Sequence, residues 1–151
     1  SFYHYFDGKD ALLSTLSSLF DEKYEELTGL LTPEMTAMEQ LLFLNRELFH
    51  MIEDSISLDL LARLYSTQLT TNGEKHLLDH NRIYYKLLRK IIAKGQAEGQ
   101  LSSRSNVNEM VKLYALCERA LLYDWCLCAG EYALTEYSAK VLPGFLSSFL
   151  P

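Results

Sequence analysis

The chain has 151 residues, of which 48% are hydrophobic and 23% are charged, as in an ordinary soluble globular domain with one well-buried core. Its formal net charge is −6 at pH 7 and its basic residues form no stripe, so the chain as a whole is not expected to seek a phosphate backbone. No apolar run reaches the roughly 18 residues of a membrane span, and no charged-then-apolar leader opens the chain, so the sequence predicts a cytoplasmic protein with no membrane partner.

Helical periodicity runs through nearly the whole chain, and no stretch shows sustained two-residue alternation. The first long helix is expected from about Lys9 to Leu31, with Asp7-Gly8 as a turn signal just ahead of it. Its apolar residues recur at three- and four-residue steps and comprise Leu12, Leu13, Leu16, Leu19, Phe20, Leu27 and Leu30. Thr32-Pro33 then predicts a stop and a restart, with proline at a first helical position.

Two further helices are expected before residue 73. Thr36 with Glu39 has the capping-box pattern at the start of the first, and Asn72-Gly73 ends the second. Their apolar stripes comprise Met38, Leu41, Leu42, Leu48, Phe49 and Ile52, and then Leu58, Leu61, Leu64, Tyr65 and Leu69.

A fourth helix is expected from Glu74 to about Gly99, and Gly95 and Gly99 weaken its end. Its apolar residues are Leu77, Tyr84, Leu87, Leu88, Ile91 and Ile92. The polar stretch Ser102–Ser105 predicts a loop, after which Asn106 with Glu109 caps the next helix.

The fifth helix, Val107–Ala129, is apolar on two faces. One face carries Val111, Tyr114, Cys117, Leu121 and Trp125, and the other carries Leu113, Leu116, Ala120, Tyr123 and Leu127. A helix that is apolar nearly all round is buried all round, so we expect one face in the subunit's own core and the other against a second subunit. The last helix, Tyr132–Leu150, contains Pro143, which is expected to kink it or to split off its last turns.

These patterns predict an all-α fold of about six helices, in which the last two form a four-helix bundle with their copies in a homodimer. The predicted dimer interface comprises Leu116, Ala120, Tyr123, Leu127, Leu142 and Leu146. The three cysteines, Cys117, Cys126 and Cys128, are an odd number in a reducing compartment, so we expect small buried side chains rather than disulfides.

The segment Ser1–Leu13 is the most informative motif of the chain. It reads SFYHYFDGKDALL: a small residue, an apolar residue and Tyr, then His, an aromatic pair, a short turn, and Lys with an acidic residue and a Leu pair. The segment resembles the boundary between the DNA-reading helix and the fourth helix of the TetR/AcrR family of transcriptional regulators. The six-helix remainder is similar to that family's C-terminal regulatory part in order and length.

The resemblance implies a division of the chain. Residues 1–8 would be the remnant of a helix-turn-helix DNA-binding domain, and residues 9–151 the effector-binding and dimerisation domain. The family's first two helices and the front of its third would precede Ser1, so operator DNA is expected to bind only through that missing part. Tyr3, His4 and Lys9 match positions that contact DNA phosphates in the family, and the start of a helix also favours an anion.

Polar residues interrupt several apolar stripes, among them Asn45, Gln68, His80, Asn81 and Glu118. A buried polar group costs free energy unless it is paired, so these residues either pair with one another or face a cavity that holds a ligand. The predicted effector site comprises Asn45, Phe49, Tyr65, Gln68, His80, Tyr84, Ile91, Tyr114, Cys117, Glu118, Leu121 and Trp125.

Aromatic residues are numerous in that set, so the expected effector is a small molecule with a bulky, largely apolar body. In one interpretation it also carries a cationic group that pairs with Glu118. In the rival interpretation, Glu118 bonds to Arg119 of the partner subunit and the cavity is neutral. The cavity is expected between the helices that begin near Lys9, Thr36, Glu74 and Val107.

No enzyme chemistry is indicated. The serines lie in no Gly-x-Ser-x-Gly elbow, and glycine loops that cradle phosphates are missing. His76 and His80 are four residues apart, but no third ligand can be assigned, so neither a metal nor another cofactor is expected. The resemblance therefore implies a ligand-responsive transcriptional regulator, most commonly a repressor. The alternative is a stand-alone helical small-molecule-binding or adaptor protein without a DNA role.

Overall fold

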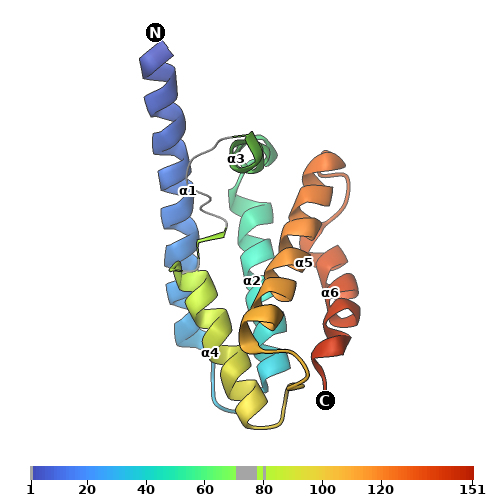
Figure 1. Ribbon diagram of the computed structural model, residues 1–151. Coiled ribbons are helices and arrows are strands. Elements are labelled where there is room, and N and C mark those ends of the chain that lie inside the picture. The colour runs from blue at the N-terminus through green and yellow to red at the C-terminus, as the bar shows by residue number, and fades with distance from the viewer. Residues whose placement is uncertain (1, 71–77, 80) are drawn as a thin grey trace.

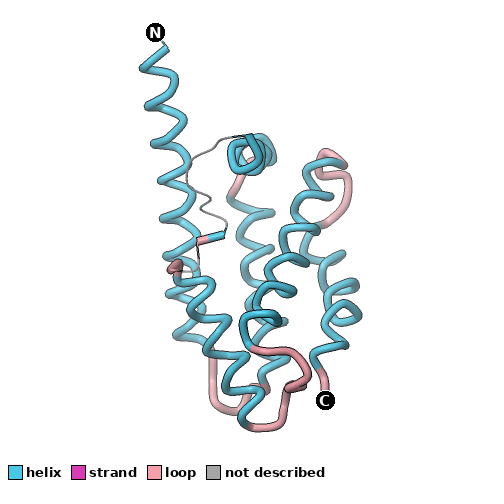
Figure 2. Tube along the Cα trace, viewed as in Figure 1, coloured by secondary structure: helices cyan, strands magenta, loops and turns pink. Residues whose placement is uncertain are grey.

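The computed structural model in Figure 1 describes the backbone of residues 2–70, 78, 79 and 81–151, and the side chains of these residues except 2–13 and 70. This part of the chain forms six α-helices and a terminal 3-10 helix, and it contains no strand (Figure 2). The elements are α1 (Phe2–Leu30), α2 (Ala37–Ser55), α3 (Leu58–Thr70), α4 (Ile83–Ala97), α5 (Val107–Leu127), α6 (Leu134–Phe145) and η2 (Leu146–Phe149). The predicted all-α fold of six helices is confirmed.

Helix α2 lies at the centre of the bundle and packs against α1, α4 and α6. Helices α5 and α6 run side by side on one flank, α1 and α4 form the opposite flank, and α3 crosses one end and contacts α5 (Figure 1). The N-terminal part of α1 extends beyond the rest of the bundle. The largest fully buried side chains include Phe49, Tyr114 and Phe149, which come from α2, α5 and η2, so one core joins the whole bundle. None of the described helices has both the length and the apolar character needed to cross a membrane.

Two helix starts follow the predicted capping chemistry. The Glu39 amide donates to Thr36 Oγ1 at 3.1 Å at the start of α2, and the Glu109 amide donates to Asn106 Oδ1 at 2.8 Å at the start of α5. Each side chain satisfies an amide that has no partner inside the helix. The predicted restart at Thr32-Pro33 is wrong, because the chain turns there and α2 begins only after the Thr36 cap.

Two predicted boundaries differ from the structure. Helix α1 runs without a break through Asp7-Gly8, since one glycine costs a helix only about 1 kcal/mol relative to alanine and the residues on both sides continue the helical pattern. Helix α4 begins at Ile83, not Glu74. Asp79 forms the turn ahead of it, with its carboxylate accepting from the Asn81 amide at 2.9 Å and its carbonyl from the Arg82 amide at 3.1 Å. Residues 74–77 and His80 lie outside the described residues.

The C-terminal helix divides as Pro143 predicts. Proline cannot donate the backbone hydrogen bond of its turn, and α6 ends two residues later at Phe145. The chain then tightens into η2, whose Leu146 and Phe149 side chains return to the core. The turn before α6 contains Ala129 and Gly130, both with positive φ, so α5 ends at Leu127, two residues before the predicted end at Ala129.

Gly95 is required for close packing near the end of α4. A Cβ at this position would lie 2.7 Å from Ala37 Cβ and 2.8 Å from Leu101 Cγ. A hydrogen bond also joins the start of α2 to the loop after α4, because the Ala37 amide donates to Gln100 Oε1 at 2.9 Å. The glycine expected only to weaken a helix end therefore lets α4 approach the start of α2.

We predict that Gly95→Ala lowers the free energy of unfolding by about 1–3 kcal/mol, because backbone or Leu101 must move to admit the methyl group. Gly29→Ala is the matched control: it also lies in a helix, but a Cβ there meets nothing within 4 Å. This control should raise the free energy of unfolding by about 0.5–1 kcal/mol. Urea unfolding of both variants measures the difference, and equal effects of the two substitutions would contradict the packing role of Gly95.

Candidate functional site

A buried polar network links four helices around Glu118 of α5. This residue is only 3% exposed. The Tyr84 hydroxyl of α4 donates to Glu118 Oε1 at 2.5 Å, and Asn45 Nδ2 of α2 donates to Oε2 at 2.9 Å. The Ser138 hydroxyl of α6 then donates to Asn45 Oδ1 at 2.7 Å. Of the two alternatives left by the sequence, internal pairing is therefore realised for Asn45 and Glu118.

The electrostatics of this network follow from its burial. Desolvation raises the pKa of Glu118 above its ordinary value, although the hydrogen bonds from Tyr84 and Asn45 act in the opposite direction. Burial and the nearby Glu118 carboxylate raise the pKa values of Tyr24, Tyr84 and Tyr114 well above the ordinary tyrosine value. These phenols consequently remain protonated at physiological pH, and the hydroxyls of Tyr84 and Tyr114 donate to Glu118 Oε1 and to the Leu41 carbonyl.

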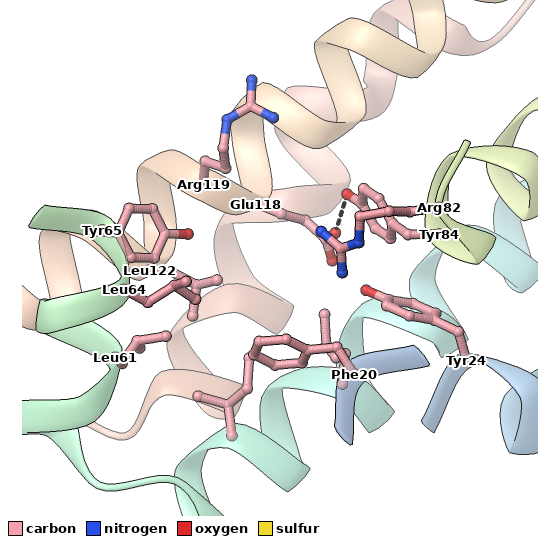
Figure 3. Close-up of a pocket in the computed structure, with 12 residues that line it drawn as sticks. Phe20, Tyr24, Leu61, Leu64, Tyr65, Arg82, Tyr84, Glu118, Arg119 and Leu122 are labelled. Carbon is pink, nitrogen blue, oxygen red and sulfur yellow. Dashed lines mark hydrogen bonds between the residues drawn. The ribbon is translucent and has the colours of Figure 1, made fainter. Parts of the chain in front are cut away.

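A small cavity of about 60 Å³ lies beside this network (Figure 3). Its walls come from α1, α2, α3, the turn before α4, α4 itself and α5, and comprise Phe20, Tyr24, Leu48, Ile52, Leu61, Leu64, Tyr65, Arg82, Tyr84, Glu118, Arg119 and Leu122. In Figure 3 the side chains of Arg82, Tyr84 and Tyr24 lie on one side of the cavity and Tyr65 lies on the other, with its hydroxyl pointing into the cavity. Arg82 Nε is 3.8 Å from Asp21 Oδ1, so this ion pair joins the cavity wall to α1.

Three of the predicted effector residues line this cavity: Tyr65, Tyr84 and Glu118. Buried residues of the predicted set that do not line it are Asn45, Phe49, Ile91, Tyr114, Cys117, Leu121 and Trp125. His80 lies outside the described residues. The inward stripe of a helix mostly meets other helices, and only the residues at which helices diverge face open space.

Nine of the lining residues were not predicted from the sequence as effector-site residues: Phe20, Tyr24, Leu48, Ile52, Leu61, Leu64, Arg82, Arg119 and Leu122. A signal existed for Phe20 and Tyr24, which are four residues apart and share one face of α1. No periodicity could reveal Arg82, because it precedes α4 and belongs to no helical stripe.

An open groove lies on the outside of α3 and α5, next to the cavity. Its volume is about 450 Å³, and it is lined by Tyr65, Gln68, Leu69, Leu78, Leu116, Arg119, Ala120 and Tyr123. Gln68 of the predicted effector set therefore lines the groove and not the cavity. Tyr65 and Arg119 border both spaces, so they form the partition between them.

The predicted dimer residues fall into two groups. Leu116, Ala120, Tyr123 and Leu127 are exposed on the outer face of α5, and Leu127 reaches 70% exposure. Leu142 and Leu146 are 0% exposed, because they pack in the subunit's own core, so we withdraw them from the predicted interface. The exposed large apolar side chains of α6 are instead Tyr137 and Phe145.

The remaining predicted site residues have simple placements. Tyr3, His4 and Lys9 lie in the projecting part of α1, and their side chains are not described. Cys117 is buried, and burial with the Glu118 charge raises the pKa of its thiol to about 11, which keeps it protonated. Cys126 and Cys128 are half-buried free thiols. The described residues contain no group of three His, Cys, Asp or Glu side chains placed to hold a metal ion.

No protein-family model, curated protein or solved structure matches this chain.

We predict that Glu118→Gln removes a pH dependence of stability. Because the pKa of Glu118 is raised in the folded chain, the folded state binds the proton more tightly than the unfolded state. The resulting stabilisation is complete below the ordinary glutamate pKa and is lost as the pH rises through the raised value. The parent should therefore lose stability relative to Glu118→Gln as the pH rises from about 4, the ordinary glutamate pKa, through the raised pKa of Glu118.

Urea unfolding at several pH values measures this difference. Glutamine can accept from Asn45 and donate to Tyr84, so the network keeps its hydrogen bonds. Glu25→Gln, at an exposed position of α1, is the control and should leave the pH profile of the parent unchanged. A constant stability difference between parent and Glu118→Gln across this pH range would contradict the prediction.

Proposed function

We propose that this chain is the effector-binding and dimerisation domain of a cytoplasmic, ligand-responsive transcriptional regulator of the TetR type, most commonly a repressor. The observation that carries the proposal is the position of α1. Its Phe20 and Tyr24 form one wall of the cavity, and its projecting part carries the TetR-like motif with Tyr3, His4 and Lys9. A single helix thus runs from the wall of the cavity to the end expected to meet DNA.

The size of the cavity supports a coupled mechanism. Pockets for drug-sized ligands have volumes of roughly 300–1,000 Å³, so a bulky effector does not fit the cavity of about 60 Å³ unless its walls separate. A ligand that binds the separated arrangement more tightly shifts the population of α1 positions. In a dimer, that shift changes the spacing of two DNA-reading heads and hence their affinity for an operator.

The effector is proposed to be small and mainly apolar, since aliphatic and aromatic side chains predominate in the cavity walls. The cationic option and the pairing of Glu118 with Arg119 of the partner subunit both lose support. Both oxygens of Glu118 already accept hydrogen bonds inside the subunit, and a cation or a partner residue would have to break them. We therefore do not include either in the proposal.

The alternative proposal is a stand-alone helical binding or adaptor protein. The same cavity and groove would serve it, and the net charge of −6 gives no attraction to DNA. The two proposals differ in whether the intact protein, including any residues encoded before Ser1, selects a DNA sequence.

We predict that the chain is a homodimer and that Tyr123→Glu or Leu127→Glu weakens dimerisation by about tenfold or more, because each places a charge in an apolar contact. Light scattering and sedimentation over micromolar concentrations measure the dissociation constant. Leu30→Glu is the control, at an exposed leucine that ends α1 away from the α5 face, and it should leave the dimer unchanged. A monomeric parent at micromolar concentration would rule the interface out.

We predict that Lys9→Ala in the intact protein weakens binding to all DNA sequences alike and reduces the salt dependence of log K by up to about one, as expected for one phosphate contact. Sites selected from random or genomic DNA, followed by titration at several salt concentrations, provide the measurement. Lys94→Ala, near the end of α4 that lies far from the N-terminus of α1 (Figure 1), should have no effect. A loss confined to one base position would contradict the phosphate role, and absence of any selected sequence would favour the adaptor alternative.

A further inference from the structure

The charged groups around the cavity favour a ligand of one sign. Two guanidinium groups, Arg82 and Arg119, border the cavity, against one carboxyl group, Glu118. Asn45 and Tyr84 already donate to the two oxygens of Glu118, and burial raises the pKa of this carboxyl group, which favours its uncharged form. The polar groups that face the cavity are thus mainly donors and cations.

Arg82 is the better placed of the two cations. Its side chain is only 13% exposed, and it lines the cavity on the same side as Tyr24 and Tyr84 (Figure 3). Its ion pair with Asp21 spans 3.8 Å, too long for a hydrogen bond, so the contact is an electrostatic one without the geometry of a close pair. Arg119 lies at the border with the groove and donates to the Tyr85 hydroxyl at 3.1 Å.

The two adjoining spaces differ in size and character. The cavity of about 60 Å³ has room for a head group of a few atoms, whereas the groove of about 450 Å³ has room for the body of a small molecule. Leu69, Leu78 and Leu116 give the groove an apolar lining. A ligand with a compact charged end and an apolar body therefore matches both spaces, provided that it passes the partition made by Tyr65 and Arg119.

We propose that the site takes an amphipathic organic acid, with its anionic head group in the cavity on Arg82 and its apolar part in the groove between α3 and α5. This inference rests on the proposed function as an effector-binding domain and specifies its ligand class. A head group bound by Arg82 competes with Asp21, and the exchange releases a tie between the cavity wall and α1. Arg82 would therefore both bind the head group and connect the cavity wall to α1.

Calorimetry with three probes of equal chain length, decanoate, decanol and decylammonium, tests the inference on the parent chain. We expect decanoate to bind about tenfold or more tightly than decanol, as for a charge-assisted hydrogen bond. Arg82→Gln should remove this preference and leave decanol binding unchanged. The matched control Arg46→Gln, at an exposed arginine of α2, should keep it.

A second variant tests the proposal even if Arg82→Gln does not fold. Asp21→Asn removes the competing carboxylate while Arg82 remains, so it should strengthen decanoate binding and leave decanol binding unchanged. Light scattering on the same samples is needed because Leu116, Ala120 and Tyr123 belong both to the groove and to the proposed dimer face.

The outcomes separate the ligand class from the proposed function. Equal affinity for decanoate and decanol, tighter binding of decylammonium, or a preference that survives in a folded Arg82→Gln variant would overturn the anion assignment and leave an apolar effector site in place. Failure of all three probes to bind would overturn both the ligand class and the effector site. A decanoate preference lost in Arg82→Gln and increased in Asp21→Asn would establish Arg82 as the recognition residue.

Discussion

The bundle is organised around a carboxyl group that is buried away from water. An ionised group of this kind is tolerated only when hydrogen bonds compensate for its lost hydration, and Asn45 and Tyr84 supply them to Glu118 from two other helices. Ser138 extends the chain of bonds to α6. Because each bond needs its donor and acceptor within about 3 Å of each other, the network fixes the relative register of α2, α4, α5 and α6 more narrowly than apolar contacts alone.

The cavity lies where that network meets α1, α3 and the turn before α4. Tyr24 of α1 packs against Tyr84 of the network, with ring centroids 5.0 Å apart, and Phe20 of α1 and Arg82 of the turn before α4 also line the cavity. Helix α1 packs mainly against α2 and α4, and its N-terminal part extends beyond the rest of the bundle. In the proposed mechanism, a ligand that separates the cavity walls shifts the position of α1.

The outer face of α5 imposes a second constraint. Leu116, Tyr123 and Leu127 are each about half exposed or more in the single subunit, an uneconomical arrangement for large apolar side chains on one helix. A partner subunit would remove this surface from water. Since part of the same face lines the groove, the proposed dimer contact and the proposed ligand site share Leu116 and Tyr123.

The sequence by itself determined the features that depend on residues close together in the chain. Helical periodicity, the Thr36 and Asn106 caps and the interruption by Pro143 act over one or two turns, and each appeared as predicted. The start of α4 and the continuity of α1 through Gly8 were wrong because competing local signals differ by only about 1 kcal/mol and the surrounding chain decides between them.

Only the tertiary structure decided which inward residues pair and which face open space. The pattern selected Asn45 and Glu118 as unusual, but their 73-residue separation made their hydrogen bond invisible to periodicity. It placed Leu142 of α6 and Leu146 of η2 at the dimer interface, whereas both side chains lie in the core, and it gave no sign of Arg82. Helical periodicity identifies an apolar face, whereas the neighbour that covers this face depends on the packing angles of the whole bundle.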